Sequence, residues 1–209
     1  MPERDNRIAR IAGKLLVGPQ TVEDTTTLRP DWEPLVPPKT PPVQAAVLIA
    51  LVKRGAGYSV LYTQRSATLR AHSGQVSFPG GKVDPTDANV AAAALREAEE
   101  EVALAASDAE VIGYLPSYFT GTNYLITPVV AVVDPRMPFV ANPYEVDDVF
   151  EVPLALIART ESYGTYRLHR GNVEYRTWQI DHEGRVIWGI TANLTRRFRD
   201  LALNEEDGW

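Results

Sequence analysis

Apolar residues along the chain gather in short blocks, some with strand-like and some with helix-like spacing. The run QAAVLIALVKR (44–54) has strand length, and after a glycine turn YSVLYTQRS (58–66) predicts the returning strand of a hairpin. Further strands are expected at 76–78, 110–119, 124–133 and on both sides of Gly171-Asn172. Helices are expected at 87–104, at 151–159 after Pro153, and in the C-terminal segment, where Ile187, Ile190, Leu194, Phe198 and Leu201 have helical spacing. This order predicts a mixed α/β fold of the α+β type, with a mixed or mostly antiparallel sheet packed against helices.

The first 43 residues differ in pattern from the rest. Residues 1–20 predict a short amphipathic helix, with Ile8, Ile11, Leu15 and Leu16 roughly on one side. Residues 28–42 hold six prolines and predict an extended connector. We therefore expect an N-terminal helix and connector over 1–43, followed by one globular domain over 44–209.

Composition narrows the functional classes. The chain of 209 residues has no cysteine, which excludes thiol catalysis, and its net charge of −6 argues against a general nucleic-acid binder. No secretory signal or run of about 18 apolar residues is present, so we expect a cytoplasmic protein without a membrane partner. An acidic protein can still bind a polyphosphate if metal ions lie between the two sets of negative charge.

The expected helix at 87–104 carries an acidic face. With an advance of roughly 100° per residue, Glu97, Glu100 and Glu101 fall together, Glu99 falls away from them, and an apolar stripe forms around Leu95. Like charges at this spacing cost a few tenths of a kcal/mol per pair, which a bound cation would relieve. Oxygen ligands favour Mg²⁺ or Mn²⁺. A solvated surface is the alternative, but the preceding Pro79-Gly80-Gly81-Lys82 turn, which brings backbone carbonyls near the carboxylates, favours a site.

These residues resemble the box of the Nudix family, Gly-x5-Glu-x7-Arg-Glu-U-x-Glu-Glu-x-Gly-U, in which U is apolar. Gly81 opens it here, and REAEEEVAL (96–104) closes it. Three departures are Asp87 in place of the first Glu, a following spacer of eight residues, and Ala103 in place of the late glycine. We interpret Asp87 as a helix cap, and we expect the helix end to lack a glycine cap or to continue by part of a turn. The resemblance implies a sheet sandwiched between helices and metal ligands Glu97, Glu100 and Glu101, with a carbonyl of Gly80 or Gly81.

A second motif narrows the expected substrate. The segment LYTQRSATLRAHSGQVSFPGG (61–81) is similar to the region before the box in the coenzyme A pyrophosphatase branch of that family. The resemblance implies hydrolysis of the diphosphate of coenzyme A or its derivatives, giving 3′,5′-ADP and (acyl-)4′-phosphopantetheine. Another nucleoside diphosphate derivative, such as ADP-ribose or a dinucleotide, is the alternative within enzymes. A non-catalytic nucleotide-binding module is the alternative outside them, and a homodimer is a further expectation.

The remaining roles follow from the resemblance and from charge. In YEVDDVFEVPLA (144–155) the resemblance implies an extra carboxylate that reaches the metals, from Glu145 or alternatively from Asp147 or Asp148. Glu100, Glu101 or Glu145 is expected to accept the proton of the attacking water, and Arg96 is expected to orient a glutamate or bind phosphate. The nearest cations for substrate phosphates are Arg65, Arg70 and Lys82. For these charged residues the alternative is a solvated surface position, and for Glu145 a charged loop before the Pro153 helix.

Overall fold

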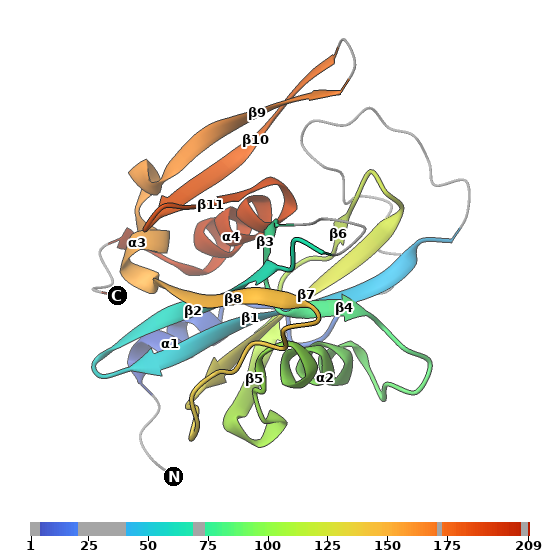
Figure 1. The fold of residues 1–209 in the computed structure, drawn as a ribbon. Coiled ribbons are helices and arrows are strands. Elements are labelled where there is room, and N and C mark those ends of the chain that lie inside the picture. The colour runs from blue at the N-terminus through green and yellow to red at the C-terminus, as the bar shows by residue number, and fades with distance from the viewer. Residues whose placement is uncertain (1–4, 21–40, 69–73, 171–172, 206–208) are drawn as a thin grey trace.

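A computed structural model describes residues 5–20, 41–68, 74–170, 173–205 and 209 (Figure 1). Its large sheet has eight strands in the order β3-β2-β1-β7-β5, with β4 paired to β1, β6 to β7 and β8 to β2. The strands of this sheet are β1 (Val43–Arg54), β2 (Gly57–Arg65), β3 (Val76–Ser77), β4 (Gly80–Lys82), β5 (Ala109–Tyr114), β6 (Tyr118–Phe119), β7 (Tyr124–Val133) and β8 (Val146–Pro153). The helices are α1 (Asn6–Ala12), α2 (Val90–Val102), α3 (Leu154–Ala158) and α4 (Gly189–Ala202), with short 3-10 turns η2 (Ala106–Asp108) and η3 (Thr160–Ser162).

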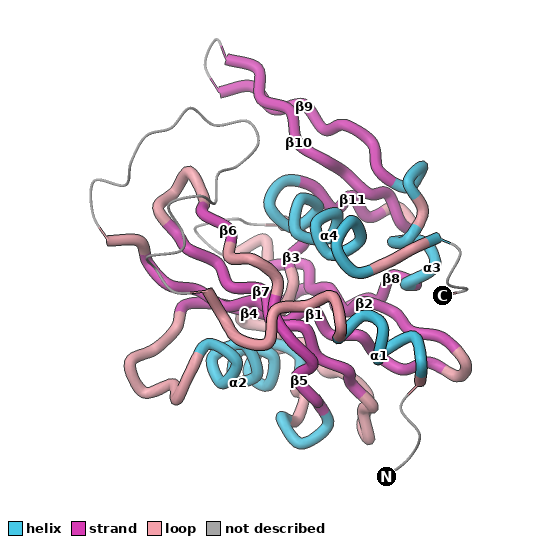
Figure 2. Tube along the Cα trace, turned by 180° about the vertical axis from the view of Figure 1, so that it is seen from behind, coloured by secondary structure: helices cyan, strands magenta, loops and turns pink. Residues whose placement is uncertain are grey.

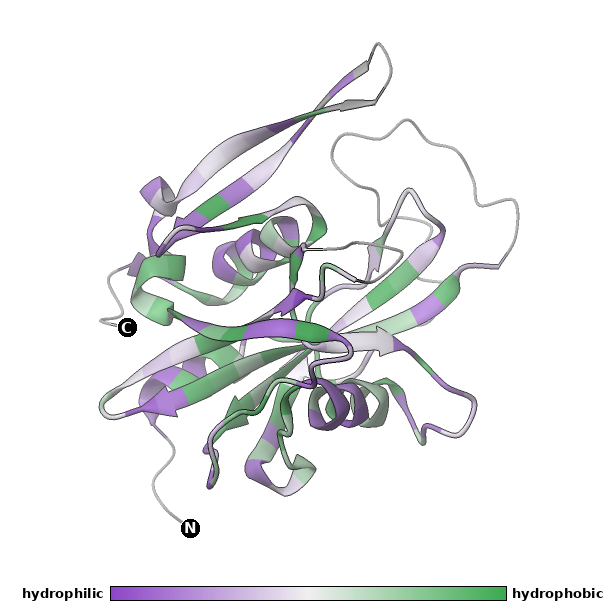
Figure 3. Ribbon diagram, viewed as in Figure 1, coloured by the Kyte–Doolittle hydropathy of each residue, from purple (hydrophilic) through white to green (hydrophobic). Residues whose placement is uncertain are grey.

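The central strand β1 organises two layers of core. Alternate side chains of β1 point to opposite faces of the sheet. Those facing α2 are Ala46, Leu48, Ala50 and Val52. Ile49 and Leu51 pack on the other face, with α1 and α4. Figure 2 shows α2 and α4 on opposite sides of this sheet, and Figure 3 shows its central strands as largely hydrophobic. The predicted α+β sandwich of a mixed sheet between helices is therefore confirmed.

One edge of β1 is shared by two partners. Residues 51–54 of β1 pair with β2, whereas Ala45, Ala46 and Val47 pair with β4. Between these two stretches the Leu48 amide donates to Pro79 O at 2.8 Å. The segment 76–82 therefore lies between β1 and β2 where these two strands diverge, because β3 pairs with β2 at Thr63 and β4 pairs with β1.

A second sheet of three strands, β11-β10-β9, contains the predicted hairpin as β9 (Tyr163–Arg170) and β10 (Val173–His182). The prediction of helix at Ile187 was wrong, because Ile187 is buried in β11 (Arg185–Trp188). Glu183 and Gly184 both have positive φ, 49° and 79°, as a tight hairpin turn requires. Helix α4 therefore begins only at Gly189.

The N-terminal helix is confirmed as α1, with Ile8 and Ile11 buried in the core beside α4. It ends at Ala12, so Leu15 is buried after the helix and Leu16 forms a β-bridge with Tyr114 instead of lying on the helix face. The proline-rich connector falls almost entirely on 21–40, which lie outside the described residues. No helix in the described ranges combines the length and the apolar character needed to cross a membrane.

The boundaries of α2 differ from the prediction at both ends. Its cap is Asn89, whose side chain accepts from the Ala92 amide at 2.9 Å, and not Asp87. At the other end Ala103 takes the left-handed conformation, with φ 55° and ψ 30°. The helix end thus lacks a glycine cap, as expected, and does not continue; alanine takes the left-handed position that glycine usually occupies.

Replacing Ala103 by glycine is expected to stabilise the protein. The left-handed conformation costs a residue with a Cβ about 1–2 kcal/mol, and Ala103 is exposed, so little packing is lost. After the entropy that glycine adds to the unfolded chain, we expect a gain of about 0.5–1 kcal/mol and a Tm higher by about 1–4 °C. Thermal and urea unfolding measure this, with Ala105→Gly as the control at an ordinary φ of −63°. An Ala103→Gly protein no more stable than Ala105→Gly would contradict the argument.

Candidate active site

The three glutamates of the acidic face on α2 differ sharply in exposure. Glu100 is 51% exposed, Glu97 is 16% exposed and Glu101 only 2%. Glu99, predicted to point elsewhere, is exposed. The predicted apolar stripe is confirmed: Ala98 and Val102 are fully buried, and Leu95 packs half-buried against the same core. The helix is turned so that one edge of its acidic face enters the protein.

The glycine turn lies directly against these carboxylates. A Cβ on Gly81 would come within 2.5 Å of the Glu97 carboxyl carbon, and the Gly80 amide donates to Glu101 Oε2 at 3.3 Å. A Cβ on Gly80 would come within 2.4 Å of Ala46 O on β1. Both glycines are therefore required for close approach, Gly80 to the neighbouring strand and Gly81 to the carboxylate. The predicted juxtaposition of glycine turn and acidic face is present.

Glu101 is a buried acid with few compensating contacts. Besides the Gly80 amide, its described partner is Arg65, whose NH1 lies 3.7 Å from Oε1. Burial raises the pKa of the Glu101 carboxyl to about 7, against the lowering effects of Gly80 and Arg65. Burial also raises the pKa of Glu97, and Arg96 acts in the opposite direction. Both carboxylates would be stabilised by additional positive charge.

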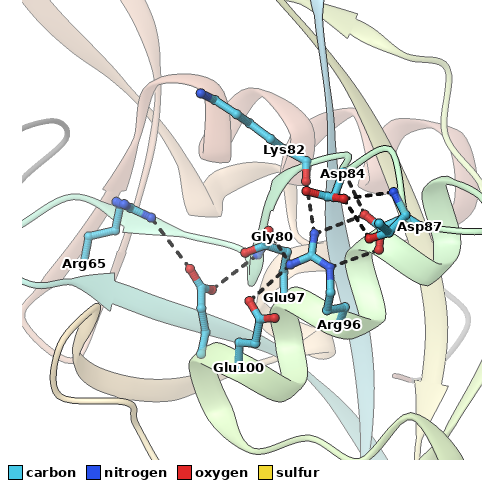
Figure 4. A network of polar contacts seen from close by, with 10 residues as sticks. Arg65, Gly80, Lys82, Asp84, Asp87, Arg96, Glu97 and Glu100 are labelled. Atoms are coloured by element: carbon cyan, nitrogen blue, oxygen red, sulfur yellow. Dashed lines mark hydrogen bonds and ion pairs between the residues drawn. The ribbon is translucent and has the colours of Figure 1, made fainter.

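Arg96 joins the loop before α2 to the acidic face (Figure 4). Its Nε and NH2 donate to the two oxygens of Asp87 at 3.0 and 3.1 Å, and NH1 donates to Glu97 at 3.0 Å and to Glu100 at 3.1 Å. NH2 also donates to Lys82 O at 3.2 Å. The hydrogen bonds from Arg96 lower the pKa of Asp87, and those carboxylates raise the pKa of Arg96. Asp87, wrongly predicted to cap the helix, instead anchors the arginine, and Arg96 has the contacts of an orienting residue.

Glu145 lies close to the same carboxylates, in the turn just before β8. Its negative charge is among the causes that raise the pKa of both Glu97 and Glu101. Its carbonyl accepts from the Ser66 amide at 2.9 Å, which ties the turn to the end of β2. Glu145 therefore stands beside the acidic face, and its role in the reaction stays a prediction.

The segment before Glu145 also binds the C-terminus of α2. The amides of Val140 and Asn142 donate to the carbonyls of Val102 and Glu101, at 3.0 and 2.9 Å. These bonds satisfy carbonyls that the end of a helix leaves free. Sequence reasoning missed this docking, since nothing in the local pattern at 139–143 indicates a partner 40 residues earlier in the chain.

The alternatives to Glu145 have other partners. Asp147 accepts from the Ala67 amide at 2.8 Å, and Asp148 pairs with Arg185 at 2.6 Å. Both residues lie in β8, so the predicted alternative of a charged loop before the Pro153 helix was wrong from Val146 onward.

The predicted phosphate-binding cations are placed differently from one another. Arg65 lies at the end of β2, and its Nε is buried without a hydrogen-bond partner among the described residues. Figure 4 shows the exposed side chain of Lys82 extending away from the acidic face, although its carbonyl belongs to the Arg96 network. Arg70 falls within 69–73, outside the described residues.

The donor set fits a hard divalent cation in chemistry. Carboxylate oxygens from Glu97, Glu100 and Glu101 stand next to the Gly80–Gly81 backbone, and burial of one of them disfavours its charge. Within the described ranges, no three acidic or histidine side chains already converge as a complete coordination cage. Arg96 donates hydrogen bonds to Glu97 and Glu100, so these side chains would have to rearrange when an ion binds.

Known proteins resemble this chain in sequence. The NUDIX domain family matches residues 42–167. The Nudix hydrolase NudL of Escherichia coli (strain SMS-3-5 / SECEC) is 49% identical over 160 residues, which cover 77% of this chain and 81% of that protein. NudL of Shigella boydii serotype 18 matches to the same extent.

Among solved structures, a Caenorhabditis elegans Ap4A hydrolase complex is 20% identical, with a TM-score of 0.45 over 54% of this chain and 80% of that one. The MutT protein from Methanosarcina mazei Go1 is 22% identical, with a TM-score of 0.46 over 58% and 83%. The family match and the 49% identity carry the assignment. The chain belongs to the Nudix family of hydrolases and is a pyrophosphohydrolase.

Proposed function

We propose that this pyrophosphohydrolase cleaves the diphosphate bond of coenzyme A or its acyl derivatives. Water attacks one phosphorus, the bond from that phosphorus to the bridging oxygen breaks, and the second phosphate leaves with the bridging oxygen. The products are 3′,5′-ADP and 4′-phosphopantetheine or its acyl form.

The observation that carries this proposal is the position of Arg65. Arg65 belongs to the motif upstream of the box that resembles the coenzyme A branch, and its guanidinium lies 3.7 Å from the buried Glu101 carboxylate. The Arg65 side chain is 29% exposed, so the protein does not fully enclose it at the edge of the acidic face. A guanidinium there can hold a phosphate oxygen of the substrate while it neutralises part of the carboxylate charge.

Mg²⁺ or Mn²⁺ would be held by Glu97, Glu100, Glu101 and a carbonyl of Gly80 or Gly81. When bound, the metal polarises phosphoryl oxygens, neutralises charge on the leaving group and lowers the pKa of a bound water.

The chain's own residues position the substrate and accept a proton. Glu100, Glu101 or Glu145 accepts the proton of the attacking water, because all three carboxylates border one face. Arg96 orients Glu97 and Glu100 through its shared NH1. Arg65, at the edge of the acidic face, neutralises part of the diphosphate charge.

The test is hydrolysis of coenzyme A with Mg²⁺ and then Mn²⁺, with products separated by chromatography. We expect the wild type to form 3′,5′-ADP. We expect Glu100→Gln to form it at a rate lower by about 10²-fold or more. Glu99→Gln, on the other side of the same helix, is the matched control and should retain activity.

Two other results would redirect the assignment. Turnover of ADP-ribose or a dinucleotide without turnover of coenzyme A would exclude the proposed substrate while keeping the chemistry. Equal rates in Glu100→Gln and wild type would remove Glu100 from the machinery.

A further inference from the structure

A pocket of about 420 Å³ lies on the opposite face of the main sheet from α2. Helix α4, strand β10 and strand β6 form its walls, and α4 lies between the two sheets in Figure 1. Its lining residues are Tyr118, Thr165, Arg176, Thr177, Trp178, Asn193, Arg196, Arg197 and Asp200. None of the residues assigned above to the active site is among them.

The lining is strongly cationic for a protein with a net charge of −6. Three arginines and one aspartate line the pocket. Arg197 has no hydrogen bond or ion pair to another residue in the described part of the chain, and its guanidinium lies 5.2 Å from the Tyr118 ring centroid. Arg176 Nε donates a hydrogen bond to Glu174 Oε1 at 3.0 Å. The positive charge of this surface is only partly neutralised by the protein itself, which favours an anionic ligand.

A flat surface lies beside these charges. The Arg196 guanidinium carbon lies 3.5 Å from the Trp178 ring centroid, and Arg196 Nε donates to Asp200 at 3.3 Å. The contact to Asp200 holds the arginine over the indole. A guanidinium held in this way presents a planar cationic face, on which nucleobases stack.

One amide fastens the three walls together. Asn193 of α4 accepts from Thr177 Oγ1 at 2.9 Å and from the Trp178 amide at 3.4 Å. Its Nδ2 donates to the hydroxyl of Tyr118 on β6 at 3.2 Å. The pocket is thus pre-organised rather than a space between independent elements.

The sheet register connects this pocket with the glycine turn. Tyr118 pairs with Ile126, Ile126 with Ala45, and Ala45 with Lys82, so these residues form one row across four strands. Register partners point to the same face, and Tyr118 and Ile126 pack in the core on the α4 side. Three strand spacings, about 14 Å across the sheet, separate the backbone of Tyr118 from that of Lys82.

We propose that this arginine–tryptophan pocket binds the phosphorylated nucleoside end of the substrate. Arg197 and Arg176 hold a phosphate monoester on the ribose, and the base stacks on the Arg196–Trp178 pair. The inference rests on the proposed function, because coenzyme A carries such a 3′-phosphate next to adenine. It assigns recognition of that end to α4 and β10, outside the box and the upstream motif.

A binding experiment without divalent metal tests the pocket independently of catalysis. Titration calorimetry would compare 3′,5′-ADP with AMP, which lacks the 3′-phosphate, in wild type, Arg197→Gln and Arg176→Gln. We expect the wild type to bind 3′,5′-ADP about ten-fold or more tightly than AMP, as charge-assisted hydrogen bonds to phosphate allow, and each variant to lose most of that difference. Arg136→Gln, an exposed arginine paired with Asp108, is the matched control and should keep it.

Kinetics supply the second arm. In wild type, kcat/KM for coenzyme A should exceed that for 3′-dephospho-coenzyme A, and Arg197→Gln should reduce this ratio about ten-fold. Equal wild-type affinity for 3′,5′-ADP and AMP, or a preference that survives in both arginine variants with unchanged Tm, would overturn the pocket assignment. Absence of coenzyme A turnover alone would overturn the proposed function, while the binding arm would still decide on the pocket.

Discussion

Glu101→Gln should leave the protein almost inactive and yet as stable as the wild type. Glu101 is 2% exposed, and burial raises its pKa to about 7, so the fold gains little from its charge. The amide keeps the shape and can still accept from Gly80, while Arg65 is 29% exposed and remains in contact with water. If the carboxylate serves the reaction, its removal should lower kcat/KM by about 10²–10⁴-fold.

The measurement pairs kinetics with thermal unfolding, with and without Mn²⁺. Ligand that binds only the folded state raises Tm, so the wild type should gain Tm with Mn²⁺ and Glu101→Gln much less. Glu99→Gln, exposed on the same helix, should resemble the wild type in both assays. A Glu101→Gln protein that is active but markedly unstable would assign Glu101 a structural role instead.

Substitution by alanine should lower mainly the catalytic rate at Gly81 and mainly the stability at Gly80. In Gly81→Ala the new Cβ meets the end of the Glu97 side chain, which can move aside. Displacing a catalytic group by about 1 Å can cost about 10²-fold in rate, so we expect a stable protein with strongly reduced kcat. In Gly80→Ala the Cβ meets the backbone of β1, at 2.4 Å from Ala46 O and 2.7 Å from Val47 Cα. We expect a loss of about 3 kcal/mol in unfolding free energy and a Tm lower by roughly 6–12 °C.

Urea unfolding and kcat, measured on both variants, separate these effects. The contrast itself is the prediction, because the substitutions are chemically identical and one residue apart. Equal losses of stability in the two proteins would show that the Glu97 side chain has no room to yield.

Local patterns predicted the parts of this molecule that depend on near neighbours. The alanine- and glutamate-rich helix, the glycine turn and the β1–β2 hairpin follow from spacing and turn chemistry within a few residues. Asn89 rather than Asp87 caps α2 because Asp87 has a stronger partner in Arg96, nine residues away. Helical spacing at Ile187 was misleading, since the turn at Glu183-Gly184 directs that residue into a strand.

The site depends on contacts that are distant in sequence, and these were harder to predict. The docking of Asn142 on the end of α2 brings Glu145 to the acidic face, and only the tertiary structure shows it. No sequence motif singles out the arginines of α4, and only the tertiary structure places β10 and β6 beside them. The base, the metal ligands and the oligomeric state stay predictions.

Because β2 and β4 pair with different stretches of one edge of β1, the short segment 76–82 borders both faces of the sheet. In a continuous sheet, the hydrogen-bonded backbone and the packed side chains separate the residues on one face from those on the other. Here the acids belong to a helix behind the sheet, and Lys82 and the arginine–tryptophan pocket belong to the front. At the fork beside Leu48 the sheet is completed by segment 76–82, which pairs with β1 through Gly80 and Gly81 and places them against the carboxylates of α2. Three successive residues thus join the two faces of the sheet: Gly80 and Gly81 lie against the acids, and Lys82 belongs to the row that leads to Tyr118.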